Sequence, residues 1–245
     1  MHPSIRLCIP LVLLLWPAFG LAQFNLDIHT GTSGKLFTRL VIDQEGFPVT
    51  VIDDVQYETR PWLPASSLFL LTQNYYDVRV GYFMRPVDGT GPDFGIELEL
   101  LHDKIYYVSG DDPDRIVGYF ELSDGVNYLL LNGALRWPYL ESDEYPGGRL
   151  QVVTRLGFGP VITAPASRIR GREHGSTLHG SWNAYEYAGM GFGLGTQLRW
   201  FVLPWLALSG EMRYTYSEPV QSIAGGTAQT FLPTLHFNFG LSFSF

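Results

Sequence analysis

The stretch Thr234-Leu235-His236-Phe237-Asn238-Phe239-Gly240-Leu241-Ser242-Phe243-Ser244-Phe245 decides the fold class of this chain. Side chains alternate between the two faces of a β-strand, so one face here carries only leucine and phenylalanine. The other face carries threonine, histidine, asparagine, glycine and serine. A strand face that is wholly aromatic or leucine suits lipid better than water. We therefore expect a membrane strand with Phe237 and Phe239 toward lipid and His236 inward.

A last strand that ends in phenylalanine resembles the assembly signal of bacterial outer-membrane β-barrels. The start of the chain agrees with an outer-membrane location. Arg6 precedes an apolar run from Cys8 to Trp16, and Gly20-Leu21-Ala22 provides the small residues that a signal peptidase needs. The run is too short for a membrane-spanning helix. We predict a signal peptide over 1–22 and a mature barrel over 23–245. Cys8, the only cysteine, would leave with the signal, so the mature chain would have no thiol.

The composition narrows the classes of function. Without Arg6 the predicted mature chain has 15 basic against 24 acidic residues, which argues against nucleic acid as a partner. Aromatic residues make up 15% of the chain, there are 27 glycines, and no mature segment reaches the length of an apolar membrane helix. This combination is typical of a membrane β-barrel.

The alternation predicts one all-β domain, an eight-stranded antiparallel transmembrane β-barrel with up-and-down meander topology. The links near Arg85–Asp93, Trp137–Gly148 and Leu203-Pro204 are short, which predicts a periplasmic side that also holds both termini. The other links are long and polar and are expected outside the cell. The first of them, 34–74, contains two alternating runs around Gln44-Glu45-Gly46 that could form an extended hairpin. The predicted strands are Asn25–Ser33, Tyr75–Met84, Phe94–Val108, Gly125–Trp137, Arg149–Ile162, Tyr185–Phe201, Trp205–Ser217 and Thr234–Phe245.

The same alternation directs five acidic and five basic side chains into the barrel. Eight strands enclose a space that side chains fill, and an unpaired buried charge is costly, so we expect these groups to pair as a structural salt-bridge core. An ion path or a catalytic acid pair is the alternative. Inward glycines of the sixth strand are expected to make room for bulky neighbours. The inward charged residues are Asp27, Asp77, Glu97, Glu99 and Glu211 with Arg79, Arg136, Arg155, Arg199 and Arg213.

Three residues are candidates for catalysis. Strict alternation from Glu97 directs His102 to lipid, whereas a β-bulge near Leu100-Leu101 would turn His102 and Lys104 inward. His236 on the last strand would then lie at a similar height. Histidine and lysine can serve acid–base chemistry or, for histidine, hold a metal. The alternative is that both histidines are hydrogen-bonded fillers of the barrel wall.

A cluster of arginines marks the third outer link. Arg168, Arg170 and Arg172 lie within five residues of one another in an otherwise acidic chain. Guanidinium groups match phosphate geometry, so the cluster is a candidate site for the phosphates of lipid A. The alternative is a solvated loop whose arginines pair with acids of the chain itself.

Several motifs resemble a family of small proteobacterial outer-membrane barrels that includes lipid A oxidase-like proteins. They are Phe94–Glu99 with His102-Asp103-Lys104, Asp124–Leu129 with Asn132, Ile169-Arg170-Gly171, and Leu235-His236-Phe237 with Gly240. That family commonly has histidines where this chain has Asp124 and, nearby, Ala164. The resemblance implies lipid A as substrate class and, for an oxidase, a divalent metal and oxygen. The His-x-Ser pair of lipid A 3-O-deacylase barrels is not matched, because the residue two positions after His236 is Asn238 and not serine.

Two functions remain open from the sequence. One is a barrel that acts on or binds lipid A or lipopolysaccharide at the outer leaflet, with His102, His236 and Lys104 as first candidates. The other is a non-enzymatic barrel that contacts a protein partner through its outer loops. The two departures from the family's histidines and the long 34–74 segment favour binding over catalysis.

Overall fold

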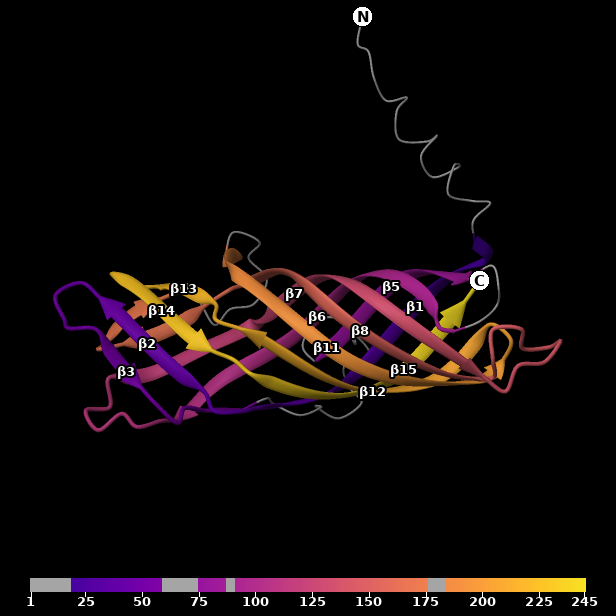
Figure 1. Ribbon diagram of the computed structural model, residues 1–245. Coiled ribbons are helices and arrows are strands. Elements are labelled where there is room, and N and C mark those ends of the chain that lie inside the picture. Colours follow the sequence, from indigo (N-terminus) through magenta and orange to yellow (C-terminus); the bar gives the residue numbers. More distant parts are fainter. Residues whose placement is uncertain (1–18, 59–74, 87–90, 176–183) are drawn as a thin grey trace, which may run out of the picture.

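The computed structural model describes residues 19–58, 75–86, 91–175 and 184–245, with side chains from residue 23 onward. Eight antiparallel strands form a closed barrel in which each strand pairs with the next and the last pairs with the first (Figure 1). The predicted all-β, eight-stranded, up-and-down barrel is therefore confirmed. Its strands are β1 (Phe19–Lys35), β5 (Tyr76–Pro86), β6 (Asp93–Ser109), β7 (Val117–Tyr139), β8 (Leu150–Thr163), β11 (Glu186–Leu203), β12 (Leu206–Ser217) and β15 (Thr234–Ser244).

A belt of apolar side chains surrounds the barrel. Alternate residues of the strands point outward and stay more than half exposed, for example Phe239 at 62% and Leu131 at 61%. Large apolar side chains gain nothing from facing water, so this belt is the lipid-facing surface of a transmembrane barrel. Other members of the belt are Val80, Ile96, Leu98, Leu156, Phe158, Leu194, Leu198, Leu208, Met212 and Phe237.

The two ends of the barrel differ. At one end, which we call the base, the backbone of Phe24 exchanges hydrogen bonds with Phe245, and the turn between β11 and β12 is short. The first 18 residues of the expected signal peptide lie outside the described residues, and β1 begins at Phe19. The opposite end carries the long connections. Among the residues with a described structure, no helix has the length and apolar character to cross a membrane.

Two barrel strands, β6 and β7, continue well past the belt. The prediction that the fourth strand begins at Gly125 was wrong, because β7 begins at Val117 and pairs with β6 as far as Tyr106. Between Asp103 and Ile105 the partner on β7 moves by four residues, from Val126 to Leu122. This β-bulge around Ser123–Gly125 breaks the alternation that the sequence pattern relies on.

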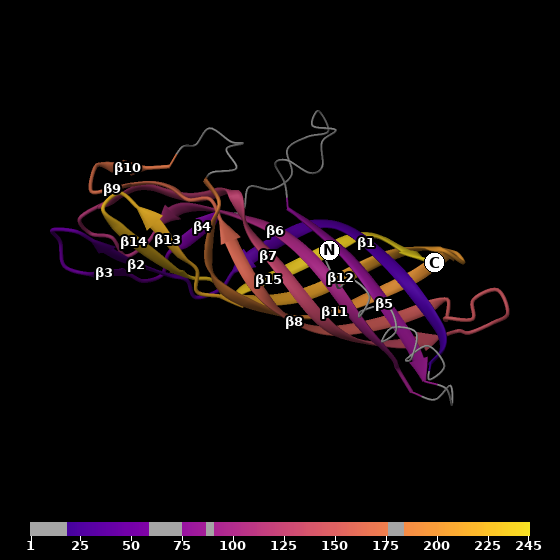
Figure 2. The same ribbon diagram turned by 90° about the horizontal axis from the view of Figure 1, so that it is seen from above.

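A cap of short strands covers the end opposite the base (Figures 1 and 2). A four-stranded sheet in the order β13-β14-β2-β3 forms one side of it, and we call it the cap sheet. The hairpin of β2 and β3 lies within the long 34–74 segment, of which residues 59–74 lie outside the described part. The cap strands are β2 (Arg39–Gln44), β3 (Thr50–Ile52), β4 (Gln56–Glu58), β9 (Ala166–Ile169), β10 (Arg172–His174), β13 (Val220–Ile223) and β14 (Gly226–Phe231).

The cap has an apolar core of its own. Ile42 and Ile52 of the cap sheet and Ile105 and Phe120 of the extended barrel strands are each at most 1% exposed. They belong to one cluster with Leu101 and Tyr128, which point into the top of the barrel. The cap thus closes this end of the lumen with packed hydrocarbon.

Candidate functional site

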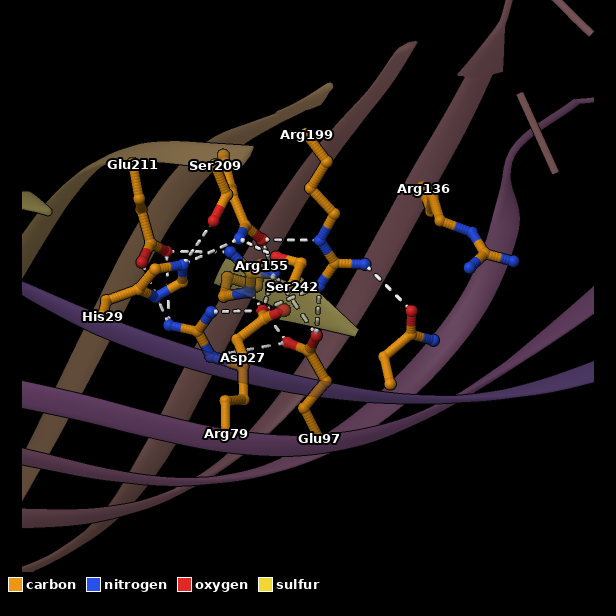
Figure 3. A network of polar contacts seen from close by, with 12 residues as sticks. Asp27, His29, Arg79, Glu97, Arg136, Arg155, Arg199, Ser209, Glu211 and Ser242 are labelled. Carbon is orange, nitrogen blue, oxygen red and sulfur yellow. Dashed lines mark hydrogen bonds and ion pairs between the residues drawn. The ribbon is translucent and has the colours of Figure 1, made fainter. Parts of the chain in front are cut away.

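The barrel lumen holds a continuous network of buried ion pairs (Figure 3). Arg155 contacts Glu97 at 2.7 Å and Glu211 at 2.8 Å, and Arg199 contacts Asp27 at 2.8 Å. Every acid and base of the network is at most 4% exposed. Further short links join Arg79 to Asp27 (3.1 Å), Asp77 (2.7 Å), Glu99 (3.3 Å) and Glu211 (3.1 Å), and Arg213 to Glu99 (2.8 Å).

Glycines on the inner face make this network possible. A Cβ atom placed on Gly193 would come within 2.4 Å of the Arg213 guanidinium, and one on Gly195 within 2.8 Å of a Glu211 oxygen. The long side chains of Arg213 and Glu211 on β12 therefore lie over the neighbouring strand β11 where that strand has no side chains. The expectation that these glycines make room for bulky neighbours agrees with this geometry.

Arg136 lies apart from the network, as Figure 3 shows. Its guanidinium contacts Asp93 at 2.6 Å near the base, and donates to Gln23 at 2.6 Å. Asp93 also contacts Arg85 at 3.1 Å. The sequence grouped Arg136 with the central charges, whereas the structure gives it a separate partner at the base.

A Ser–His–Asp arrangement lies inside the lumen. The Nε2 atom of His29 is 2.8 Å from the Ser209 hydroxyl, and its Nδ1 atom is 3.3 Å from Asp77. His29 and Ser209 face a lumen that buried ion pairs fill and that the cap closes, so a substrate has no space to reach the hydroxyl. His29, Asp77 and Glu211 could also surround a cation, but the Arg79 guanidinium already contacts both carboxylates. We assign this group to the structural network.

A second polar cluster lies above the network and below the cap. Lys35 contacts Asp103 at 2.5 Å, and Ser33 donates to the same carboxylate at 2.9 Å. His236 points into the lumen, 2.7 Å from the Thr215 hydroxyl. The sequence placed Lys35 in a loop and therefore gave no partner to Asp103.

His102 points out of the barrel, whereas His236 points into the lumen. Its strand neighbour Leu101 is opposite inward Asp77, so His102 faces outward beside Leu100 at the cap side of the belt. This agrees with strict alternation from Glu97. The alternative, a bulge near Leu100-Leu101 that would turn His102 toward His236, is not present in β6. The two histidines occupy opposite faces of the wall. A metal bound by both does not fit this arrangement.

The surroundings of His102 are nevertheless specific. Its ring stacks on Tyr76 at 4.6 Å between centroids, and its Nδ1 atom is 2.7 Å from Asn127. The ring also lies against Gly125, where a Cβ atom would come within 2.3 Å of the ring and where the backbone has a positive φ of 111°. His102 is 6% exposed, and its Nε2 atom has no hydrogen-bond partner within the described residues.

The neighbouring positions include those where the resembling family has histidines. Asp124 precedes Gly125, and its carbonyl oxygen accepts a hydrogen bond from the Tyr185 hydroxyl at 3.2 Å. Ala164 follows Thr163, which pairs with Val126. Lys104 lies just beyond, 7% exposed and near the carboxylates of Asp124 and Glu121.

The three arginines of the third outer connection have different environments. Arg170 donates to Thr50 at 2.7 Å and to Gln44 at 3.2 Å, and its guanidinium lies 4.6 Å from the Phe47 ring. Arg172 also lies over Phe47 and donates to the Glu45 carbonyl at 3.3 Å. These two arginines hold the β2–β3 turn against the β9–β10 hairpin. Arg168 is the exposed member, with its side chain 51% accessible and 3.8 Å from Glu173.

The chain is only weakly similar to known proteins. No protein-family model matches this chain, and no curated protein matches it either. Among solved structures it is similar to outer membrane protein OprG from Pseudomonas aeruginosa, at 6% identity and a TM-score of 0.39 over 93% of this chain and 98% of that one. It is also similar to Neisserial surface protein A, at 7% identity and 0.36 over 91% and 97%. Ail, the attachment invasion locus protein of Yersinia pestis, gives 10% identity and 0.33 over 91% and 97%.

Sequence reasoning missed two parts of this arrangement. It did not find the Lys35–Asp103 pair, and it considered a bulge only in β6, whereas the bulge lies in β7. The signal for the second was present, because Asp124-Gly125 interrupts an alternating run with a residue that tolerates positive φ.

Proposed function

We propose that this chain is an outer-membrane barrel that binds lipid A or whole lipopolysaccharide on the outward face of β5, β6 and β7. In this proposal the cap lies outside the cell and the base, with both termini, lies in the periplasm. The apolar belt supports a membrane location, and the ordered cap supports this orientation, since outer-membrane barrels carry their longer loops outside.

The outward orientation of His102 carries the proposal. The Nε2 atom of His102 has no described partner and lies on the outward face at the edge of the lipid belt, and Lys104 follows on the same face. At 6% and 7% exposure, both groups must be uncovered by a shift of the side chains around them when a headgroup binds. The phosphorylated headgroup of lipid A lies at this height in the outer leaflet. Histidine and lysine N–H groups form charge-assisted hydrogen bonds with phosphate oxygens, which are stronger than neutral ones. Arg168 on the cap is exposed and supplies a further cation above this face.

Binding is better supported than oxidation of lipid A. The oxidase hypothesis needs several ligands for a divalent metal, but His102 and His236 lie on opposite faces of the wall and the positions near His102 carry Asp124 and Ala164. We therefore expect lipid A from cells with and without the gene to give identical mass spectra. A gene-dependent gain of one oxygen would contradict a pure binding role.

Native mass spectrometry after gentle detergent extraction tests the binding directly. The wild-type barrel should retain lipid A, and the double variant His102→Ala/Lys104→Gln should retain several-fold less because both donors are gone. His174→Ala on β10 is the matched control and should retain as much as wild type. A wild-type barrel without lipid A, or equal retention in the double variant, would contradict the proposal.

A protein partner is the second candidate function. Val51 and Val220 are 49% and 43% exposed at opposite edges of the cap sheet, joined across it by Val41 and Gln229. Exposed valines at both edges of one sheet favour contact with another protein. The same gentle extraction tests it, since a partner should co-purify and be lost in Val51→Asp. A barrel that always emerges alone would count against this candidate.

A further inference from the structure

A small cavity lies where the cap sheet meets the barrel. It has a volume of about 270 Å³ and is lined by Phe37, Thr38, Arg39, Asp53, Asp54 and Phe231. Arg39 and Phe231 are directly paired across β2 and β14, and Asp53 follows β3. The cavity thus opens on the outer face of the cap sheet, at the ends of its strands that adjoin the barrel.

Phe37 combines an exposed side chain with a strained backbone conformation. Its side chain is 88% exposed, although phenylalanine normally stabilises a protein by being buried. Its backbone has φ = 46°, a left-handed conformation that costs free energy for a bulky residue. Residues held in strained conformations gather at ligand sites. An exposed ring held at such a cost therefore indicates a surface made for a ligand.

Polar groups complete the cavity wall. The Nε atom of Arg39 is 2.6 Å from Oδ1 of Asp53, and both side chains are more than half exposed. The described contacts use only one edge of each group, which leaves the guanidinium tip and Oδ2 directed to solvent. A donor fork beside a carboxylate oxygen matches the neighbouring hydroxyls of a sugar, which both donate and accept.

The position of the cavity indicates which glycan it meets. Phe231 packs edge-on against Tyr216 at 5.3 Å, and Tyr216 packs against Phe192 of the lipid belt at 5.6 Å. These two aromatic contacts connect the cavity to the lipid-facing surface next to it. A molecule bound there lies at the height of the sugars that a membrane glycolipid presents.

We propose that this cavity binds one pyranose ring of an outer-leaflet glycolipid. The apolar C–H face of the sugar stacks on Phe37 or Phe231, whose ring faces carry partial negative charge. Arg39 and Asp53 then bind two of its hydroxyls. This inference adds a second glycolipid contact on the β11–β12 side of the barrel, across from the proposed headgroup site on β5, β6 and β7. It rests on the proposed lipopolysaccharide binding for the identity of the glycolipid.

Saturation-transfer NMR on the full chain in detergent micelles tests the cavity without any lipid. The probes are methyl glucopyranoside, galactopyranoside and mannopyranoside at about millimolar concentration, and the core oligosaccharide released from rough lipopolysaccharide by mild acid. We expect transfer to the ring protons of at least one pyranoside and of the oligosaccharide. Phe37→Ala and Asp53→Asn should each weaken it at least tenfold, and Thr227→Ala on the same sheet should not.

Two results would overturn the inference. One is the lack of transfer to every probe in the wild-type chain, and the other is transfer that both cavity variants leave unchanged. Heat-modifiable migration in gels shows that each variant has folded. Because the probes contain no acyl chains or lipid A phosphates, this experiment can fail while lipid A retention around His102 succeeds, and the reverse.

Discussion

At the scale of single residues, Glu211 shows how the lumen is stabilised. Its carboxylate lies 2.8 Å from Arg155, 3.1 Å from Arg79 and 3.7 Å from Arg213, and it is almost fully buried. Three guanidinium groups thus share one acid in a space with little water. Removing one partner from such a network leaves uncompensated buried charge, which costs more than the pair itself contributes.

We therefore expect Glu211→Gln to lower the free energy of unfolding by about 3–5 kcal/mol. The control is Asp53→Asn, which removes an exposed ion pair with a 2.6 Å contact to Arg39 and should cost only about 0–1 kcal/mol. Urea unfolding in lipid vesicles, followed by tryptophan fluorescence, measures both. Equal losses in the two variants would mean that the lumen network contributes no more than a surface pair.

At the scale of elements, the β2–β3 hairpin depends on contacts from a distant part of the chain. Arg170 and Arg172 enclose the Phe47 ring, and Arg170 also binds Thr50. Two strands of three to six residues are marginally stable alone, so these contacts and the pairing with β14 keep the hairpin ordered.

Arg170→Ala should loosen this hairpin while the barrel stays folded. Proteolysis within 43–49 on intact vesicles should become several-fold faster, because the turn loses both hydrogen bonds and one face of the Phe47 contact. Arg168→Ala, which removes an exposed guanidinium near Tyr119, should leave the cleavage rate unchanged. If the two variants are cleaved alike, the hairpin does not depend on Arg170.

The strands that the sequence predicted well are those whose lipid-facing and lumen-facing residues differ most in polarity. Along β15 and β11 the outer residues are apolar and the inner ones small or polar, so the alternation fixes register. The contrast fades near the cap, because inward Leu101 and Tyr128 are as apolar as the belt. The sequence therefore could not place the start of β7 or the side of the wall to which His102 belongs.

At the scale of the whole molecule, the lumen is filled in two layers. Charged side chains cross it within the belt, and packed apolar side chains close it beneath the cap. A hydrated ion would have to break the salt bridges and then cross hydrocarbon, and each step is costly. An eight-stranded barrel encloses only enough space for its own side chains.

These two barriers predict that the reconstituted barrel does not conduct ions. Planar-bilayer recording at both polarities should show no steady, long-lived openings, and liposomes that contain the barrel should not swell in sugar solutions. A barrel inserted without a folded cap would still be closed by the ion pairs, so Arg170→Ala should also stay silent. Steady conductance in the wild-type barrel would contradict this prediction. It would favour the alternative that the inward acids and arginines line an ion path.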